Sequence, residues 1–425
     1  MINNLKDKAY YKQLSDTFYL MLLQGVQYAI PLIIVPYLMI VLGADHYGYI
    51  GFATVICLYF NTIVEFGFNM SATKSIAIAY EERDFQEISK VFLSTFVAKL
   101  ILLLLSTVLC SSICFVIPQF RPYVPTVAFM YPLVIGGTFT FTFLFQGIGK
   151  IRALSVINMV SKILVLPLTF LFVKSPDDCN FAALIQSSVY VLTAIISICV
   201  LFKYSILHKI SITINDVKLA FKESFPLFLS NAATTLYTNL FTVILAIFAT
   251  PAMVGRYSAS ERIMRVCVLV ISQPINQAFF PKIASLGNTN RSQARTLVFK
   301  LEKIVALLMI TISVTLFATA DIIAKFLGDS YSNIAPLLRI MSLAPFAISV
   351  GGIIGQMGLV AIGNEKSKRN FCKTYWIVAP ISLLCVSILS PILFETGAAI
   401  ALVLTEYTVF ALLYHYYRQD KQKLV

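Results

Sequence analysis

The chain has 425 residues, of which 58% are hydrophobic and only 12% are charged, and its mean hydropathy is +0.83. A soluble domain is about half apolar and roughly a quarter charged, so this composition excludes an ordinary soluble protein and indicates a polytopic membrane protein. The net charge of +13 does not indicate a nucleic-acid binder, because the basic residues lie in short segments between long apolar runs.

A membrane-spanning helix needs about 20 mostly apolar residues. Twelve stretches of the sequence meet this condition, so we expect an all-α protein with twelve transmembrane helices. In chain order they are residues 17–42, 47–69, 87–117, 123–148, 151–173, 180–202, 225–249, 253–280, 297–320, 333–362, 370–394 and 396–417. Several exceed the minimum length, which predicts tilted or bent helices.

The basic residues are distributed unevenly between the two sides of this topology. The termini and alternate loops hold 24 of the 33 Lys and Arg residues, whereas the opposite side holds only Arg121, Lys174, Arg256 and Lys325. Cytoplasmic loops are enriched in Lys and Arg, so both termini are predicted to be cytoplasmic.

The longest polar connection, residues 203–224, separates two sets of six spans. It predicts an N-terminal six-helix bundle (1–202), a cytoplasmic linker (203–224) and a C-terminal six-helix bundle (225–425).

The two halves also show a sparse internal repeat. A shift of 207 positions aligns them without a gap and pairs Gly48 with Gly255, and Gln24 with Asn231. Six spans per copy keep both copies in the same orientation, so we expect a parallel repeat related by a pseudo-two-fold axis along the membrane normal.

Basic side chains inside predicted spans are the first candidates for a site, because a charge at the bilayer centre costs roughly 2.5–3.5 kcal/mol. Lys99 and Lys162 lie near the middle of their spans, and Arg262 and Arg265 lie in the eighth span. Glu261 and Arg265 are four residues apart on a helix and can pair, which leaves Arg262 without a local partner. One interpretation is that these residues line a cationic cavity that receives an anion. The alternative is that Lys99 and Lys162 snorkel to the membrane surface and that the salt bridge of Arg265 only stabilises packing.

Polar side chains accompany these charges along single helix faces. Asn158 lies one turn before Lys162, and Gln24 and Asn231 begin polar stripes in the first and seventh spans. Such stripes line a hydrated cavity or form hydrogen bonds between helices, and we take Gln24, Asn158 and Asn231 as candidate substrate contacts.

Three acidic residues inside predicted spans are candidates for ion coupling: Glu65, Glu261 and Glu406. For Glu406 the alternatives are a coupling proton and a pairing with a buried lysine. The eight cysteines and three histidines lack metal-binding spacing, and a phosphate-binding loop motif is missing, so neither a metal nor another cofactor is expected.

Two segments near the start of the chain carry a resemblance to a known family. "PYLMIVLGADHYGYIGFA" (36–53) and "EFGFNMSATKSIA" (65–77) resemble the opening of bacterial polysaccharide flippases of the Wzx type, within the multidrug/oligosaccharidyl-lipid/polysaccharide exporter superfamily. The resemblance implies a V-shaped molecule of two six-helix bundles, like that of the multidrug exporters, in the bacterial inner membrane. It also implies a transporter rather than an enzyme, which moves undecaprenyl-pyrophosphate-linked oligosaccharide, such as an O-antigen repeat unit of lipopolysaccharide, from the cytoplasmic to the periplasmic leaflet.

The partners that the resemblance implies are the lipid-linked oligosaccharide, membrane lipids, and polysaccharide polymerase and chain-length proteins. The main alternative is a multidrug or cation antiporter of the same superfamily, which would rely on acidic cavity residues. A membrane-embedded glycosyltransferase or polymerase would need a large outer loop with catalytic residues. The longest outer loop predicted here, 174–180, has seven residues.

Overall fold

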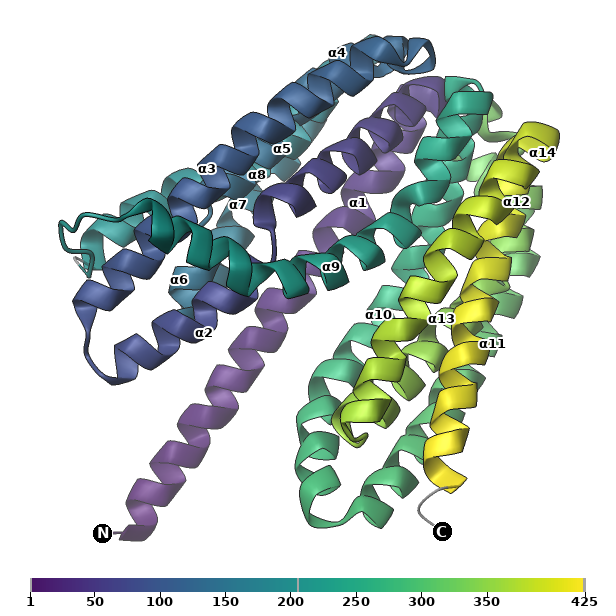
Figure 1. Ribbon diagram of the computed structural model, residues 1–425. Coiled ribbons are helices and arrows are strands. Elements are labelled where there is room, and N and C mark those ends of the chain that lie inside the picture. The colour runs from purple at the N-terminus through teal and green to yellow at the C-terminus, as the bar shows by residue number, and fades with distance from the viewer. Residues whose placement is uncertain (1, 205, 423–425) are drawn as a thin grey trace. The chain divides into compact units, whose positions relative to one another are not determined.

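The computed structural model describes residues 2–204 and 206–422, without the side chains of residues 2–29, 151, 152, 154, 204, 230, 288, 421 and 422 (Figure 1). These residues form helices, and no strand occurs among them. In chain order the helices are α1 (Ile2–Glu65), α2 (Phe68–Glu81), α3 (Phe85–Val116), η1 (Pro118–Tyr123), α4 (Val124–Met130), α5 (Pro132–Phe139), α6 (Thr142–Gly147), α7 (Ile151–Phe172), η2 (Pro176–Asp178), α8 (Cys179–Tyr204), α9 (Ile214–Phe248), α10 (Pro251–Thr289), α11 (Arg291–Leu327), η3 (Asp329–Tyr331), α12 (Ile334–Met341), α13 (Ala344–Ile353), η4 (Ile354–Ala361) and α14 (Glu365–Gln422).

Ten helical stretches of the described chain are long and apolar enough to cross a membrane. Two of them contain a break in the backbone, at Gly43 in α1, with φ of 68°, and at Phe394 in α14, with φ of 48°. Both breaks fall where the sequence predicts a turn, after the first and at the end of the eleventh span. The polytopic all-α fold is therefore confirmed, whereas the count of twelve spans stays a prediction.

Two predicted spans are interrupted helices rather than single rods. Residues 123–148 form α4, α5 and α6, and residues 333–362 form α12, α13 and the π-helix η4. Proline stands at the first turn of α5 and of α13. It lacks the backbone N–H that would continue the preceding helix, so it ends one helix and begins the next.

Many large apolar side chains lie on the outside of the helices. Leu104 of α3 is 71% exposed and Phe202 of α8 is 77% exposed. Such exposure would be unfavourable in water, but it is expected for helices that face lipid tails. In hydrocarbon, helix packing depends on close contact and polar bonds rather than on removal of apolar surface from water.

The chain forms two compact units. Unit 1 comprises Met1–Val41, Cys57–Val116 and Val124–Asn231, and unit 2 comprises Leu42–Ile56, Ile117–Tyr123 and Ala232–Val425. These units differ from the predicted domains at two places, because the predicted linker 203–224 packs within unit 1 and residues 42–56 pack within unit 2. The division into two six-helix bundles stays a prediction.

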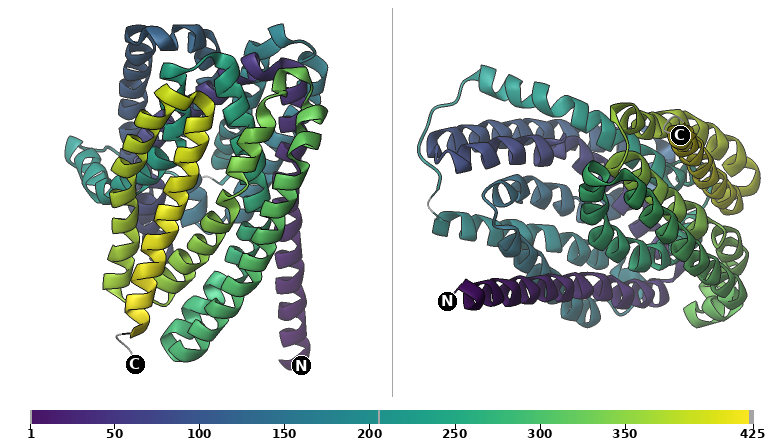
Figure 2. Two further views of the ribbon diagram at one scale, coloured as in Figure 1. Left: turned by 90° about the vertical axis from the view of Figure 1, so that its right-hand side faces the viewer. Right: turned by 90° about the horizontal axis from the view of Figure 1, so that it is seen from below.

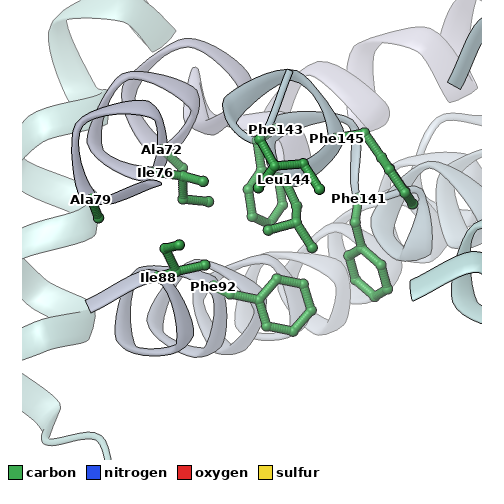
Figure 3. Close-up of a cluster of buried hydrophobic side chains, with 10 residues drawn as sticks. Ala72, Ile76, Ala79, Ile88, Phe92, Phe141, Phe143, Leu144 and Phe145 are labelled. Carbon is green, nitrogen blue, oxygen red and sulfur yellow. The ribbon is translucent and has the colours of Figure 1, made fainter. Parts of the chain in front are cut away.

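Unit 1 has a core of aromatic and aliphatic side chains between α2, α3 and α6 (Figure 3). Phe143, Leu144 and Phe145 come from α6 and are fully buried. Phe92 of α3 meets Phe141 edge to face, with ring centroids 4.9 Å apart. Elsewhere in the unit α8 packs against α4, α5 and α7. This core packs α6 against α3, the helix that carries Lys99.

Unit 2 is built on α10, which packs against α11 and α14 (Figures 1 and 2). The segment after the Gly43 break crosses α10 at two glycines. A Cβ on Gly48 would lie 2.0 Å from the Pro251 carbonyl oxygen, and a Cβ on Gly255 would lie 1.8 Å from the Ala44 carbonyl oxygen. Both positions therefore require glycine, and the crossing explains why residues 42–56 belong to unit 2.

Candidate functional site

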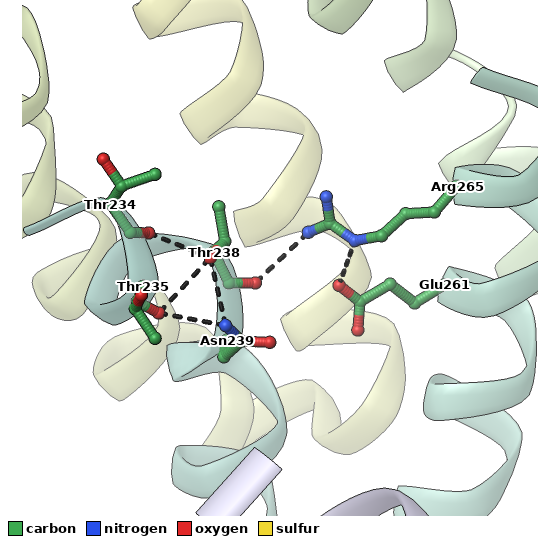
Figure 4. Close-up of polar contacts among 6 residues, drawn as sticks. All are labelled: Thr234, Thr235, Thr238, Asn239, Glu261 and Arg265. Carbon is green, nitrogen blue, oxygen red and sulfur yellow. Dashed lines mark hydrogen bonds and ion pairs between the residues drawn. The ribbon is translucent and has the colours of Figure 1, made fainter. Parts of the chain in front are cut away.

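The centre of the candidate site in unit 2 is the ion pair between Glu261 and Arg265 on α10 (Figure 4). The Arg265 Nε donates to Glu261 Oε1 at 2.8 Å, which confirms the pair predicted from the four-residue spacing. The Arg265 Nη2 donates to the backbone carbonyl of Thr238 on α9 at 3.2 Å. The guanidinium thus makes one charge-assisted hydrogen bond within α10 and a second one to α9, which connects the two helices.

A second carboxylate belongs to the same cluster. Glu406 of α14 is 5% exposed and interacts electrostatically with both Arg265 and Glu261. The sequence allowed Glu406 to pair with a buried lysine. In the structure, the cation near Glu406 is Arg265. Three helices, α9, α10 and α14, therefore meet at Arg265, and removal of its charge would leave two carboxylates close together.

Arg262 is exposed and differs from Arg265 in its surroundings. Successive residues of a helix turn by about 100°, so Arg262 lies to one side of the face on which Glu261 meets Arg265. Within the described residues Arg262 has no carboxylate partner, and the phenol of Tyr47 interacts with it electrostatically. Arg262 is thus an accessible positive charge at this cluster.

Several side chains of the polar stripe on α9 donate hydrogen bonds to backbone carbonyls of α9 itself. The Thr238 hydroxyl donates to the Thr234 carbonyl at 2.9 Å, and the Asn239 amide donates to the Thr235 carbonyl at 3.1 Å. Asn231, at the end of unit 1, is exposed, whereas Thr242 is buried. The Thr238 hydroxyl oxygen in turn accepts a hydrogen bond from the Asn239 amide at 3.1 Å, so these side chains bond largely within α9 itself.

Unit 1 holds a separate buried ion pair between α3 and the end of α1. The Lys99 Nζ lies 3.0 Å from Glu65 Oε1 and 3.1 Å from the Gly137 carbonyl oxygen, and it lies 5.9 Å from the centroid of the Phe143 ring. The Lys99 side chain is 0% exposed. It does not snorkel toward the surface, because its charge is neutralised by Glu65 in the interior of the unit.

The remaining candidates of unit 1 lie on α7 and α1. Asn158 and Lys162 are half-buried on neighbouring turns of α7, and Lys162 interacts with other residues of the chain. The side chain of Gln24 lies outside the described residues. The structure thus divides the predicted residues into the cluster of unit 2, the buried pair of unit 1 and the Lys162 face of α7.

One further ion pair in unit 2 could not be predicted from residue spacing. The Arg256 Nε and Nη2 donate to Glu395 Oε1 at 3.0 and 2.6 Å, and Glu395 follows the Phe394 break of α14. The predicted topology places Arg256 only among the few cations of the less basic side, and its partner is 139 residues away. Among the residues that the structure describes, no group of three or more His, Cys, Asp or Glu side chains could hold a metal ion.

Comparisons with known proteins show what the chain is similar to. Residues 14–286 match the family model described as polysaccharide biosynthesis protein. A protein of Escherichia coli (strain K12) named for O-antigen transport is 30% identical over 407 residues, which cover 96% of this chain and 97% of that protein. A protein of Shigella dysenteriae with the same name is 28% identical over 354 residues, 82% of this chain and 86% of its own length.

Solved structures share the fold at low sequence identity. An inward-facing multidrug resistance transporter of the MATE family and MOP superfamily has a TM-score of 0.70 at 15% identity, and the alignment covers 93% of this chain and 95% of that one. The lipid II flippase MurJ in an inward closed conformation has a TM-score of 0.65 at 15% identity, with 93% and 87% covered. These likenesses establish the transporter fold that the sequence predicted.

Proposed function

Because the chain belongs to the family of polysaccharide biosynthesis proteins, we propose that it transports a lipid-linked oligosaccharide across the membrane as a flippase. The observation that carries this proposal is the similarity, along 96% of the chain, to a relative named for O-antigen transport. The substrate is an oligosaccharide repeat unit on undecaprenyl pyrophosphate, and it moves from the cytoplasmic to the periplasmic leaflet of the bacterial inner membrane. Both termini lie in the cytoplasm.

The charge distribution of unit 2 supports an anionic substrate. A pyrophosphate headgroup cannot cross about 30 Å of hydrocarbon unless protein donors replace its water. Both carboxylates of the cluster are mostly buried and lie beside Arg265, whereas Arg262 is exposed. We therefore assign the first contact with pyrophosphate to Arg262, and the role of holding α9 and α10 together to Arg265.

Further contacts would come from Lys162 and Asn158 on α7 and from Asn231 and Gln24, which supply cationic and amide donors. Lys99 is the weakest of the four predicted cations as a substrate contact, because Glu65 neutralises it and its side chain is 0% exposed. The substrate would be released on the other side by alternating access, driven by an ion gradient or by removal of product. The hydrocarbon tail would stay in the lipid.

A cation antiporter of the same superfamily is the second candidate, and its fold is the one shared with the multidrug transporter. Such a transporter would need a carboxylate that is available to a cationic drug. Here Glu65 is paired with Lys99, and Glu261 is paired with Arg265. The chain's own cations thus occupy the carboxylates that a drug would use, so the flippase is the better supported function.

Deletion of the gene in a strain that makes surface polysaccharide tests the proposal. We expect lipid-linked oligosaccharide to accumulate in the cytoplasmic leaflet and surface polysaccharide to disappear, with both reversed by the wild-type chain. Unchanged surface polysaccharide together with increased sensitivity to cationic drugs would instead favour the antiporter.

A further inference from the structure

We propose that the oxygen atoms around the Lys99 ammonium form a binding site for a monovalent metal cation, and that Lys99 is its built-in occupant. A free cation of the Na⁺ type binds there when the ammonium is removed. The site lies entirely in unit 1, and the inference does not depend on the identity of the transported substrate.

The first observation is the set of ligands that Lys99 already uses. Its ammonium donates to one carboxylate oxygen of Glu65 and to the Gly137 carbonyl, and its remaining side faces the Phe143 ring. A carboxylate and a backbone carbonyl are the oxygen ligands that hard metal cations prefer. The position of the nitrogen is thus one that a metal cation could take.

The second observation is that two amide oxygens next to these ligands lack a donor. Asn61 Oδ1 and Asn69 Oδ1 are both buried and have no hydrogen-bond partner among the described residues. Asn61 Oδ1 lies against Gly137, because a Cβ on that glycine would come within 2.4 Å of it. The Asn69 amide nitrogen donates to Glu65 Oε2, so the Asn69 side chain also borders the carboxylate.

The orientation of the Asn69 amide follows from its neighbour. A flipped amide would place its oxygen against the Glu65 carboxylate, and two acceptors would then repel one another. A buried acceptor without a donor costs about 1–3 kcal/mol, so two of them, each beside a residue that binds Lys99, require an explanation. A cation coordinated by oxygen would satisfy both, whereas the Lys99 ammonium, already shared between Glu65 and Gly137, leaves them unpaired.

Charge balance determines which cation fits and when. The site contains one carboxylate, so a single positive charge neutralises it and a divalent ion would leave a buried net charge. Lys99 and a metal cation therefore exclude one another. Most of its ligands are neutral oxygens, so the site does not appear among groups of three or more His, Cys, Asp or Glu side chains in the described part of the chain.

The test uses the full-length purified protein and its thermal unfolding in NaCl, KCl and choline chloride at equal ionic strength. Lys99→Ala removes the ammonium and leaves space at the carboxylate. We expect Na⁺ to raise the melting temperature of Lys99→Ala saturably by at least about 2 °C over choline, and to leave the wild type unchanged.

Two matched variants separate a bound ion from a general salt effect. Lys99→Met keeps most of the side-chain volume without the charge and should not respond to Na⁺. The double variant Lys99→Ala with Glu65→Gln removes the carboxylate and should lose the response. If Lys99→Ala does not fold, Lys99→Ser takes its place, because its hydroxyl can be a further ligand. Failure of Na⁺ to restore folding of both small variants, or equal stabilisation by all three salts, would overturn the proposal.

Discussion

Gly48 and Gly255 pack against one another in unit 2, each against the backbone of the segment that carries the other. The contact is reciprocal: Gly48 faces the Pro251 carbonyl and Gly255 faces the Ala44 carbonyl. Both pairs, Gly48 with Gly255 and Ala44 with Pro251, are 207 positions apart. The internal repeat inferred from the sequence thus brings equivalent residues together, as expected beside a two-fold axis.

Alanine at either glycine should destabilise the protein. The new methyl group would meet a backbone carbonyl at 2.0 Å or less, and backbone cannot move aside as a flexible side chain can. We expect a loss of at least about 1–3 kcal/mol for Gly48→Ala and for Gly255→Ala, measured by thermal unfolding of the purified protein. Gly352→Ala is the control, because nothing lies near its added methyl group. Equal melting temperatures for all three variants would contradict the close crossing.

Arg265 and Glu406 should show energetic coupling. Replacement of either alone, Arg265→Met or Glu406→Gln, disturbs a mostly buried charge cluster and should cost about 2–4 kcal/mol. The double variant should cost less than the sum by about 1–3 kcal/mol, as measured in a double-mutant cycle.

The Arg339–Asp321 pair is the matched control for that cycle. Its two side chains are 39% and 59% exposed. For so exposed a pair the coupling energy should stay below about 1 kcal/mol. Similar coupling energies in the two cycles would mean that Glu406 does not share the environment of Arg265.

Local sequence spacing predicted some of these contacts and could not predict others. Glu261 and Arg265 were paired correctly because four residues place them on one helix face. Lys99 and Glu65 are 34 residues apart on different helices, so their contact depends on how α1 and α3 pack. The sequence identified both as candidates through their charge, and the four-residue spacing of Asn61 and Glu65 places those two side chains on one helix face, whereas Asn69 was not identified.

The helix breaks show the same limit. Gly43 lies in the gap between the first two predicted spans, and glycine adopts positive φ without strain, whereas Phe394 has a positive φ that its residue type does not favour. The Arg256–Glu395 pair beside that break spans 139 residues, and only the packed structure brings its members together.

The start of α9 should make stability depend on pH in the acid range. The Thr213 backbone N–H, the Lys90 ammonium and the Thr213 hydroxyl hold the pKa of Asp216 at about 2, below its ordinary value of 3.8. A carboxyl with a lowered folded-state pKa contributes stability above its unfolded pKa and loses it as pH falls through the folded value. Melting temperatures should therefore fall more steeply from about pH 5 to pH 2 for the wild type than for Asp216→Asn. Parallel curves would show that these bonds do not form.

Reporter fusions test the predicted topology. Fusions at positions 215 and 290 should report the cytoplasm, and a fusion at position 177 should report the periplasm, because Lys and Arg concentrate in the segments around the first two. Opposite results at these sites would reverse the proposed direction of the chain and of transport.

Transport of a lipid-linked oligosaccharide in reconstituted vesicles tests the central claim most directly. The wild type should move the substrate between leaflets, Arg262→Ala should be slower by about 10–100-fold, and Arg262→Lys should recover part of the loss, since a charged contact contributes about 1.5–3 kcal/mol. Arg339→Ala, which removes an arginine elsewhere in unit 2, should transport at the wild-type rate. An Arg262→Ala protein that flips the substrate as fast as the wild type would contradict the assignment of the pyrophosphate contact, and a wild type that does not flip it at all would contradict the proposed function.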